Sequence, residues 1–337
     1  MTVRSIKLPD DFPIITEIIP KAFVYPENPE WNTAAEVTSF RETMQNLQRF
    51  WLPLSLLLRI SPRLADIFRG YIWEEEGQPV GLIVYQRQGS TDTWYISTVA
   101  VLPSFRRRGI AHHLVTTALD AIRQAGGEMT LLKVITGNQP AYTLYEQMGF
   151  RHFTSDLVLC YDQAAPPPEI PLPDGYTLEA GDLFNWSLSY DLMQRITPAE
   201  VQRYVPVRAE QFQYPKAIRL FTPLVERISG TKQHKFVVRS SAGEVVAITD
   251  YSVRRRSGGM NQLDPNLDPC HASLAPSLIQ HSLREMQHLA PNRETQVVVP
   301  QWQQSLLEAV YAAGGVAQKE YQWMAMNLHR NPLTQPQ

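Results

Sequence analysis

The chain has 337 residues, of which 44% are hydrophobic, and its 31 basic and 33 acidic side chains give a formal net charge of −2. This length exceeds what one hydrophobic core usually serves and therefore predicts two domains. Two cysteines without metal-ligand spacing argue against a metal site or a disulfide framework and favour a reducing, cytoplasmic setting. The balanced charge argues against a nucleic-acid partner, and no apolar run is long enough for a membrane span.

The first half of the chain alternates between predicted strands and helices. SIKL predicts a short strand, a helix begins near Asp10 or Asp11, and Thr33–Gln48 predicts a second helix. Phe50–Phe68 is strongly apolar but interrupted by prolines. We expect it to form a helix and lid over a core or substrate channel, with a membrane-surface segment as the alternative. Two strands joined at residues 76–78 follow.

A strand, a turn and an amphipathic helix come next. DTWYISTVAVLP predicts a strand that Pro103 closes. The run from Gly109 places six apolar residues on one helical face and stops at Gly126-Gly127, and these residues are Ile110, Leu114, Val115, Ala118, Leu119 and Ile122. A buried strand, a short helix after Asn138 and a last strand or strand pair complete this half, and the mixed order predicts an α+β fold.

A proline-rich stretch divides the chain into similar halves. We expect a domain at residues 1–162, a stiff linker at 163–175 and a second domain at 176–330. Four landmarks recur at one constant offset, which suggests a tandem duplication. The pairs are Gly77 with Gly243, Pro103 with Pro269, Tyr145 with Tyr311 and Gly149 with Gly315.

The stretch VLPSFRRRGIAHHL has the order strand, tight turn and helix. Unpaired amides at such a helix start, with the positive end of the helix dipole behind them, predict an anion site. Gly109 keeps the approach free of bulk, and Arg106–Arg108 can add charge-assisted contacts. The sequence contains neither GxxxxGK[ST] nor GxGxxG after a strand. The anion at this site is therefore not expected to be the phosphate of a nucleotide bound by a P-loop or a Rossmann fold.

The stretch NQPAYTLYEQMGF supplies a second motif. Asn138 can cap a helix that Gly149 ends, and Asn138 and Tyr145 share nearly one face of it. A single ligand could therefore contact both side chains.

Together these two stretches resemble the paired signatures of the GNAT superfamily of acyl-CoA N-acyltransferases, in the order and at about the spacing of that family. The resemblance covers the first half directly and the second half as a degraded copy. It implies two tandem domains, each with a mixed, mainly antiparallel, splayed sheet flanked by helices. It also implies acetyl-CoA as cosubstrate, without a metal, and direct transfer of the acetyl group to an amine.

The resemblance also assigns site residues. The pantetheine arm of acetyl-CoA is expected along Val99, Ala100 and Val101, with Asn138 contacting the arm and the Tyr145 hydroxyl facing the sulfur as general acid. The pyrophosphate is expected on the backbone of the turn and helix start, formed by Arg106, Arg107, Arg108, Gly109, Ile110, Ala111 and His112.

A general base is not evident in the sequence. The family often places a glutamate near the start of the strand before the Asn motif, where this chain has Lys133. A water chain, Glu74 to Glu76 or Asp92 could serve, or the amine could arrive neutral. Lys133 is expected to be structural, or alternatively to meet an acidic substrate.

The second half keeps the frame without the arginine and glycine cradle, so we expect no ordinary CoA site there. Tyr311 is expected in the core, and VRRRSGG is expected to be a loop. The acceptor is expected to be a small-molecule or peptide amine. A non-catalytic acyl-CoA sensor or scaffold is the alternative function, and a nucleic-acid binder is a weaker one.

Overall fold

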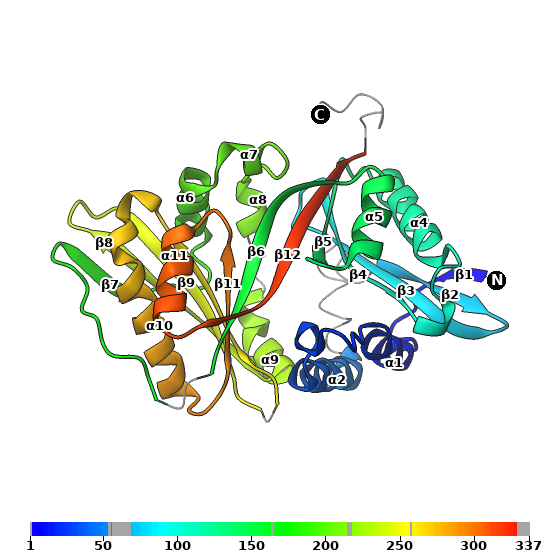
Figure 1. Ribbon diagram of the computed structural model, residues 1–337, viewed down its shortest axis with the longest axis horizontal. Helices are drawn as coiled ribbons and strands as arrows, with labels where there is room; N and C mark the ends of the chain where they lie inside the picture. Colours follow the sequence, from blue (N-terminus) through cyan, green and yellow to red (C-terminus); the bar gives the residue numbers. More distant parts are fainter. Residues whose placement is uncertain are drawn as a thin grey trace. The chain divides into compact units, whose positions relative to one another are not determined.

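Figure 1 shows the computed structural model of the protein, which describes residues 2–52, 55, 69–162, 165–213, 218–256 and 258–328. Most of the expected lid at Phe50–Phe68 lies outside these residues. The chain divides into two compact units: unit 1 comprises Met1–Phe153 and Trp323–Gln337, and unit 2 comprises Thr154–Gln322. Within the described ranges, no helix has the length and apolar character needed to cross a membrane.

Unit 1 contains a sheet in the order β1-β2-β3-β4-β5-β12. Neighbours from β1 to β4 are antiparallel, whereas β4 and β5 are parallel. Its strands are β1 (Thr2–Ser5), β2 (Arg69–Glu75), β3 (Gln78–Arg87), β4 (Thr93–Val101), β5 (Met129–Ile135) and the end of β12 (Val316–Asn327). Its helices are α1 (Phe12–Ala22), α2 (Ala34–Arg49), α4 (Ile110–Gln124) and α5 (Gln139–Gln147), with 3-10 turns η1 (Pro29–Trp31) and η3 (Pro103–Phe105).

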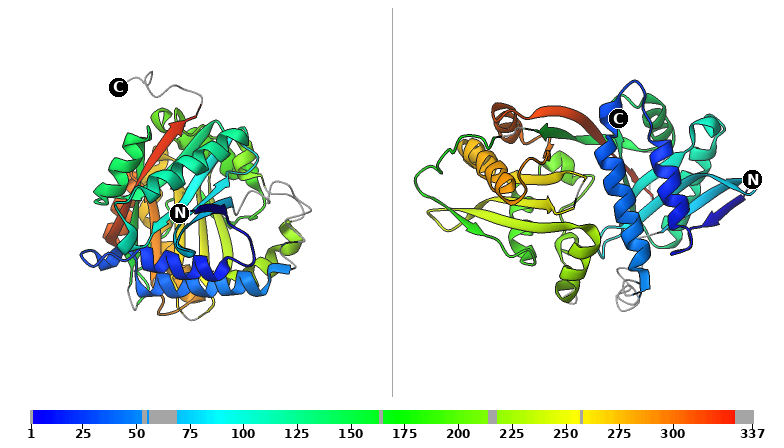
Figure 2. Two further views of the ribbon diagram at one scale, coloured as in Figure 1. Left: turned by 90° about the vertical axis from the view of Figure 1, so that its right-hand side faces the viewer. Right: turned by 90° about the horizontal axis from the view of Figure 1, so that it is seen from below.

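Side chains that alternate along the strands of this sheet belong to two separate hydrophobic cores. Ile72, Leu82 and Ala100 point to the face that packs against α1 and α2, which lie side by side (Figure 2). The neighbouring Ile83 and Val101 point to the opposite face, against α4 and α5. All six residues predicted on the apolar face of α4 are at most 3% exposed, so this prediction is confirmed.

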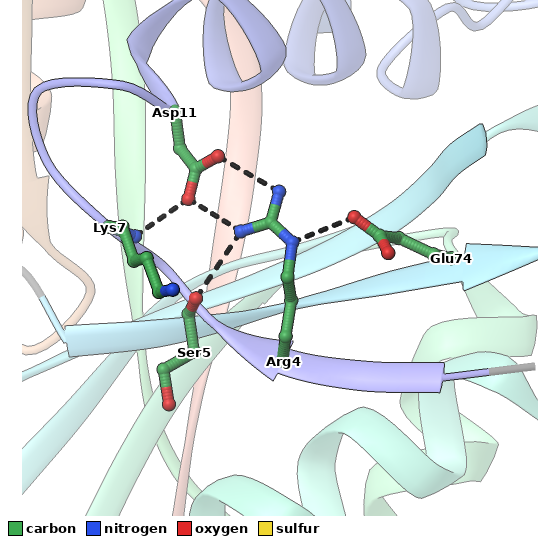
Figure 3. A network of polar contacts seen from close by, with 5 residues as sticks. All are labelled: Arg4, Ser5, Lys7, Asp11 and Glu74. Atoms are coloured by element: carbon green, nitrogen blue, oxygen red, sulfur yellow. Dashed lines mark hydrogen bonds and ion pairs between the residues drawn. The ribbon is translucent and has the colours of Figure 1, made fainter. Parts of the chain in front are cut away.

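An ion-pair network fixes the start of α1 to the sheet (Figure 3). Arg4 on β1 donates from both terminal nitrogens to the Asp11 carboxylate, at 2.7 and 2.9 Å, and from Nε to Glu74 on β2 at 2.7 Å. The backbone N–H of Lys7 also donates to Asp11. Burial alone would raise the pKa of Asp11, but the hydrogen bonds from Arg4 and Lys7 lower it below its usual value.

We expect Asp11→Asn to lower the free energy of unfolding by roughly 1.5–3 kcal/mol, because it removes charge-assisted hydrogen bonds from a buried carboxylate. The folded-state pKa of Asp11 is depressed, so its contribution is complete above the unfolded-state pKa of about 3.9 and is lost as pH falls through the folded-state value. Urea unfolding from pH 7 to pH 3 measures both effects. Asp10→Asn, at an exposed neighbour, is the matched control, and equal stability of the two variants would contradict the account.

Unit 2 repeats this plan with a sheet in the order β6-β11-β10-β9-β8-β7. Its strands are most of β6 (Arg151–Tyr161), β7 (Tyr176–Ala180), β8 (Thr231–Ser240), β9 (Val245–Arg254), β10 (Asn261–Leu267), β11 (Thr295–Pro300) and the start of β12. Its helices are α6 (Trp186–Ile196), α7 (Ala199–Gln202), α8 (Ala209–Phe212), α9 (Ile218–Ser229), α10 (Ala275–Leu289) and α11 (Gln304–Ala312), with a 3-10 turn η4 (Pro269–Leu274).

The compact units differ from the domain boundaries expected from the sequence in the unit to which the strands β6 and β12 belong. β6 begins in unit 1 but pairs antiparallel with β11 of unit 2, from Thr295↔Tyr161 to Pro300↔Asp156. The last residues of β12, from Trp323, belong to unit 1. Each unit is thus completed by the last strand of the other half of the sequence.

The expected repeat holds in the turns but shifts by one residue near its end. Gly77 and Gly243 both have positive φ, 78° and 79°. At the helix ends, Phe150 N–H donates to Tyr145 O, and Gly315 N–H donates to Val310 O in the same manner. Val310 is therefore the counterpart of Tyr145. The expectation that Tyr311 lies in the core is wrong, because it is 47% exposed.

Candidate active site

An opening in the sheet of unit 1 begins at a bulge in β4. The register with β3 passes from Val84↔Thr98 to Tyr85↔Ile96, so Ser97 is an extra residue that bends the strand. The parallel register with β5 ends at Ile96. Val99–Val101 pair with β3 only, beyond the last pair with β5. The two strands therefore splay, and one backbone edge of β4 can accept an extended ligand.

The start of α4 forms a cradle of backbone amides after this open edge. Gly109 caps the helix in the left-handed conformation, with φ 78°. The first helical bond runs from His113 N–H to Gly109 O at 3.1 Å, so the amides of Ile110, Ala111 and His112 precede the hydrogen-bond ladder. Unpaired amides and the positive end of the helix dipole suit an anion such as a phosphate.

Arg106 joins this cradle to the end of α1. Its Nε donates to Val101 O at 3.2 Å, and Nη2 donates to the carbonyl oxygen of Ala22. The guanidinium thus holds three elements together, the end of β4, the turn after it and the last residue of α1. The side chain donates to two backbone carbonyl oxygens, and its expected contact with an anion stays a prediction.

The other two arginines of the motif differ from Arg106. Arg108 pairs with Glu75 at 3.3 Å and lies over the Phe105 ring, with 5.0 Å from its guanidinium carbon to the ring centroid. Arg107 is exposed and, unusually for a non-glycine residue, has a φ of 64°. The triplet is therefore a structural part of the turn as well as a local source of positive charge.

The second motif places Asn138 and Tyr145 on α5. Asn138 caps this helix, with its Oδ1 accepting from Ala141 N–H at 3.4 Å. Tyr145 is 8% exposed, and its ring packs edge-on against Phe150. Burial, and to a smaller extent the neighbouring Tyr25, raise the pKa of Tyr145 above its usual value. Tyr145 consequently keeps its proton throughout the physiological pH range.

Two aromatic residues of the segment between α1 and α2 also belong to this site, and the sequence motifs did not identify them. Burial raises the pKa of Tyr25 above its usual value, and the nearby charge of Arg106 and the Asn138 side chain limit that rise. Its ring meets that of Trp31 edge-on at 5.0 Å. Only the clustering of aromatic side chains around the prolines of VYPENPEW could have drawn attention to them. The Trp31 ring lies against Gly137, so this segment reaches the residue before Asn138.

Most of the candidate general bases are engaged by other side chains or lie away from the cradle. Glu74 and Glu75 are engaged by Arg4 and Arg108. Asp92 precedes β4, at the end of the strand opposite the cradle. The Lys133 ammonium lies 4.7 Å from the centroid of the Trp323 ring, in a cation–π contact. A structural role for Lys133 is thus better supported than contact with an acidic substrate.

The adjacent histidines do not form a metal site. His113 contacts Gly109 O through Nδ1 at 3.0 Å, whereas His112 is exposed beside the cradle. In the part of the chain that the structure describes, no three His, Cys, Asp or Glu side chains gather in a way that could hold a metal ion.

Comparison with known proteins gives the same assignment for the first half of the chain. Residues 29–150 match the acetyltransferase (GNAT) family. These residues form a GNAT acetyltransferase domain. An N-alpha-acetyltransferase, MAK3 of Arabidopsis thaliana, is 34% identical over 89 residues, which are 24% of this chain and 47% of that protein. The chain spans about half the length of the curated relatives it matches.

Solved structures resemble the whole chain in fold. A tandem GNAT protein from the clavulanic acid biosynthesis pathway has a TM-score of 0.66 at 14% identity, covering 98% of this chain and 100% of the other. A GCN5-related N-acetyltransferase from Sphaerobacter thermophilus has a TM-score of 0.64 at 13% identity, covering 98% and 96%. At such low identity the likeness establishes the fold alone. The prediction of a tandem GNAT fold is thus confirmed.

The GNAT-like unit 2 lacks the features of the cradle in the GNAT domain. Asp268 accepts from Cys270 N–H at 2.9 Å and from Arg195, so a carboxylate caps the turn before α10. Gln303, the counterpart of Asn138 at the start of α11, donates to Leu267 O at 3.0 Å from a buried position. Unit 2 thus bonds the backbone at the end of β10 and in the turn after it with its own side chains.

Arg106→Ala should lower the free energy of unfolding by about 1 kcal/mol, because the Val101 and Ala22 carbonyls lose their charged donor. Arg107→Ala, at an exposed position in the same turn of the GNAT domain, is the matched control and should change stability by less than about half of that. Chemical unfolding of both variants beside the wild type measures the difference. An equal effect of the two substitutions would contradict the role assigned to Arg106.

Proposed function

We propose that the protein is an N-acetyltransferase that transfers the acetyl group of acetyl-CoA to a primary amine within a ternary complex. The continuity of the open β4 edge at Val99–Val101 with the amide cradle at Ile110–His112 carries the proposal. An extended chain that ends in a pyrophosphate would use both features in succession. Asn138 and Tyr145, at the cap and on the last turns of α5, are then the side chains that we propose to meet the thioester end.

The residues present fit the cosubstrate. The positive φ of Gly109 aims the first amides of α4 toward one point without a side chain between them. The backbone of β4 beyond Ser97 can pair with the amides of a pantetheine arm, as it would with another strand. The turn supplies positive charge near the cradle through Arg107 and Arg108, whereas Arg106 holds the cradle in place.

The chemistry requires little beyond orientation and one proton donor. A neutral amine attacks the thioester carbonyl, a C–N bond forms, and the C–S bond breaks. The Tyr145 hydroxyl can donate its proton to the leaving sulfur, and the nitrogen loses a proton to solvent, which in turn reprotonates the tyrosine. Glu74 and Glu75 near the β2–β3 turn are held in ion pairs, so an amine that arrives neutral, or a water chain, serves better than either of them.

Among small-molecule and peptide amines, we propose one narrower class of acceptor. The curated relatives carry the name N-alpha-acetyltransferase, which favours an α-amino group. Such a group has a pKa near 8, so a useful fraction is neutral at physiological pH without a strong base. A panel of short peptides with free N-termini, beside simple amines, therefore tests turnover.

Gly109→Glu should abolish the rise in melting temperature that acetyl-CoA gives the wild type, because the new carboxylate would stand at the mouth of the amide cradle. Gly126→Glu is the matched control. Gly126 has a similar φ, 76°, at the other end of α4, and a side chain there would meet open space. The control should therefore keep the acetyl-CoA response despite similar backbone strain.

Failure of millimolar acetyl-CoA to shift the wild-type melting temperature would contradict the cradle assignment. A shift that survives Gly109→Glu would place the cofactor elsewhere. Binding without turnover of any amine in the panel would favour a non-catalytic acyl-CoA sensor.

Tyr145→Phe should lower kcat by on the order of 10²–10⁴, the usual contribution of a positioned general acid, with little change in acetyl-CoA affinity. Since the pKa of Tyr145 is raised above its usual value of about 10, wild-type kcat should not fall on the alkaline side below about pH 10. Thiol release measured from pH 6 to pH 10 tests both statements. Tyr71→Phe on β2 is the control, and a wild-type rate for Tyr145→Phe would exclude this role.

A further inference from the structure

Three side chains of the GNAT domain gather on one face of its sheet. Tyr95 on β4, Lys133 on β5 and Trp323 on β12 come from neighbouring strands. Side chains alternate between the two faces of a strand. The residues next to these three in the chain belong to the core beneath α4 and α5, and they are Trp94, Ile96, Leu132, Val134 and Met324. Tyr95, Lys133 and Trp323 therefore lie on the opposite face, the one on which α1 and α2 pack.

Direct contacts join the three side chains. The Tyr95 and Trp323 rings lie 5.6 Å apart between centroids, with 42° between their planes. The Lys133 ammonium lies 4.7 Å from the centroid of the same Trp323 ring. All three residues are half-buried, so part of each stays accessible. Tyr95 and Trp323 thus form a small aromatic floor with a cation next to it.

The aromatic floor lies at the point where β4 and β5 diverge. Ile96↔Leu132 is the last pair of their parallel ladder. Tyr95 precedes this pair on β4, and Lys133 follows it on β5. Because the amide cradle comes after the end of β4, a pantetheine arm that leaves the cradle would run back from Val101 to Val99. Its thioester end would therefore point toward the floor.

The two faces of the sheet give the two reactants separate approaches. The helices α4 and α5 cover one face, and Tyr145 belongs to the core on that side. An amine that attacks the thioester between the diverging strands has to arrive from the opposite face, across the aromatic floor. In a peptide with a free N-terminus, the first side chain branches from the carbon that carries the amine. This side chain therefore comes to lie beside Tyr95 and Trp323.

We propose that Tyr95 and Trp323 bind the first side chain of the acceptor peptide and favour a large apolar residue at that position. The inference rests on the proposed function and adds the class of acceptor. Both rings contact the substrate, whereas Lys133 is a positioning residue that holds the Trp323 ring. The charge of Lys133 also disfavours a basic first residue. The choice of acceptor thus depends on a residue of β12 that is distant in the sequence from both acetyl-CoA motifs.

Peptides that differ only in their first residue test this inference. Wild-type kcat/KM for peptides that begin with leucine or phenylalanine should exceed that for an alanine peptide by roughly 10-fold or more, the usual worth of added methylene groups in an apolar site. Trp323→Ala should remove most of this preference by raising the KM for the two larger peptides. The alanine peptide and the affinity for acetyl-CoA should not change. Thiol release measures the rates, and isothermal titration without any amine measures the affinity.

Further variants separate acceptor binding from a general structural effect. Trp302→Ala, at a half-buried tryptophan of unit 2, is the matched control and should keep the wild-type preference. Tyr95→Leu removes the other ring of the floor and should also lower the preference, so the test does not depend on the folding of Trp323→Ala alone. Lys133→Met removes the charge and should raise kcat/KM for a peptide that begins with lysine several-fold relative to the leucine peptide.

Equal kcat/KM for all first residues in the wild type, or a preference for a small or charged one, would overturn the inference. So would floor variants that slow every peptide alike or that bind acetyl-CoA less tightly. The proposed function stands in these cases, because peptides are still acetylated. A wild type that binds no acetyl-CoA, or that acetylates no amine, would overturn the proposed function, and the inference with it.

Discussion

The extra residue at Ser97 allows β4 to follow β3 to its end while leaving β5 after Ile96. A strand interior without a partner on one side would ordinarily expose unsatisfied backbone groups, so this edge is a place that a ligand can complete. The cradle at the start of α4 and the cap at Asn138 depend on the same divergence, because a continued β4–β5 ladder would fill the space that we assign to the pantetheine arm.

The two units share one order of strands and helices but differ in the residues at the positions of the candidate site. In the GNAT domain, Gly109 leaves the first amides of α4 without a side-chain cap, and Asn138 caps α5 through Ala141 N–H. In unit 2, the Asp268 carboxylate accepts from Cys270 N–H in the turn before α10, and the Gln303 amide donates to Leu267 O. Val310 stands in the place of Tyr145, so unit 2 also lacks the hydroxyl that we propose as the proton donor. Unit 2 therefore lacks both the glycine cap and the tyrosine that unit 1 has at its candidate site.

The sequence predicted features that depend on local backbone preference. The apolar face of α4, the glycine before it and the cap at Asn138 follow from periodicity and from residue conformational preferences, and the structure places each as expected. The contact of Arg106 with Ala22 could not be predicted in this way, because the two residues are distant in the sequence. A guanidinium can also donate to a carbonyl oxygen as well as to a phosphate. The aromatic residues Tyr25 and Trp31 belong to no motif, because the contact of Trp31 with Gly137 joins residues that are also distant in the sequence. The one-residue shift that replaces Tyr145 by Val310 also escapes an ungapped alignment.

A crystal structure of the protein with CoA bound tests the central claim most directly, namely that backbone groups of the GNAT domain hold the cofactor. The account predicts pyrophosphate oxygens within hydrogen-bond distance of the amides of Ile110–His112, and the pantetheine arm paired with Val99–Val101, while Arg106 keeps its contact with Ala22 O. CoA bound in unit 2, or phosphates held by arginine side chains away from these amides, would contradict it.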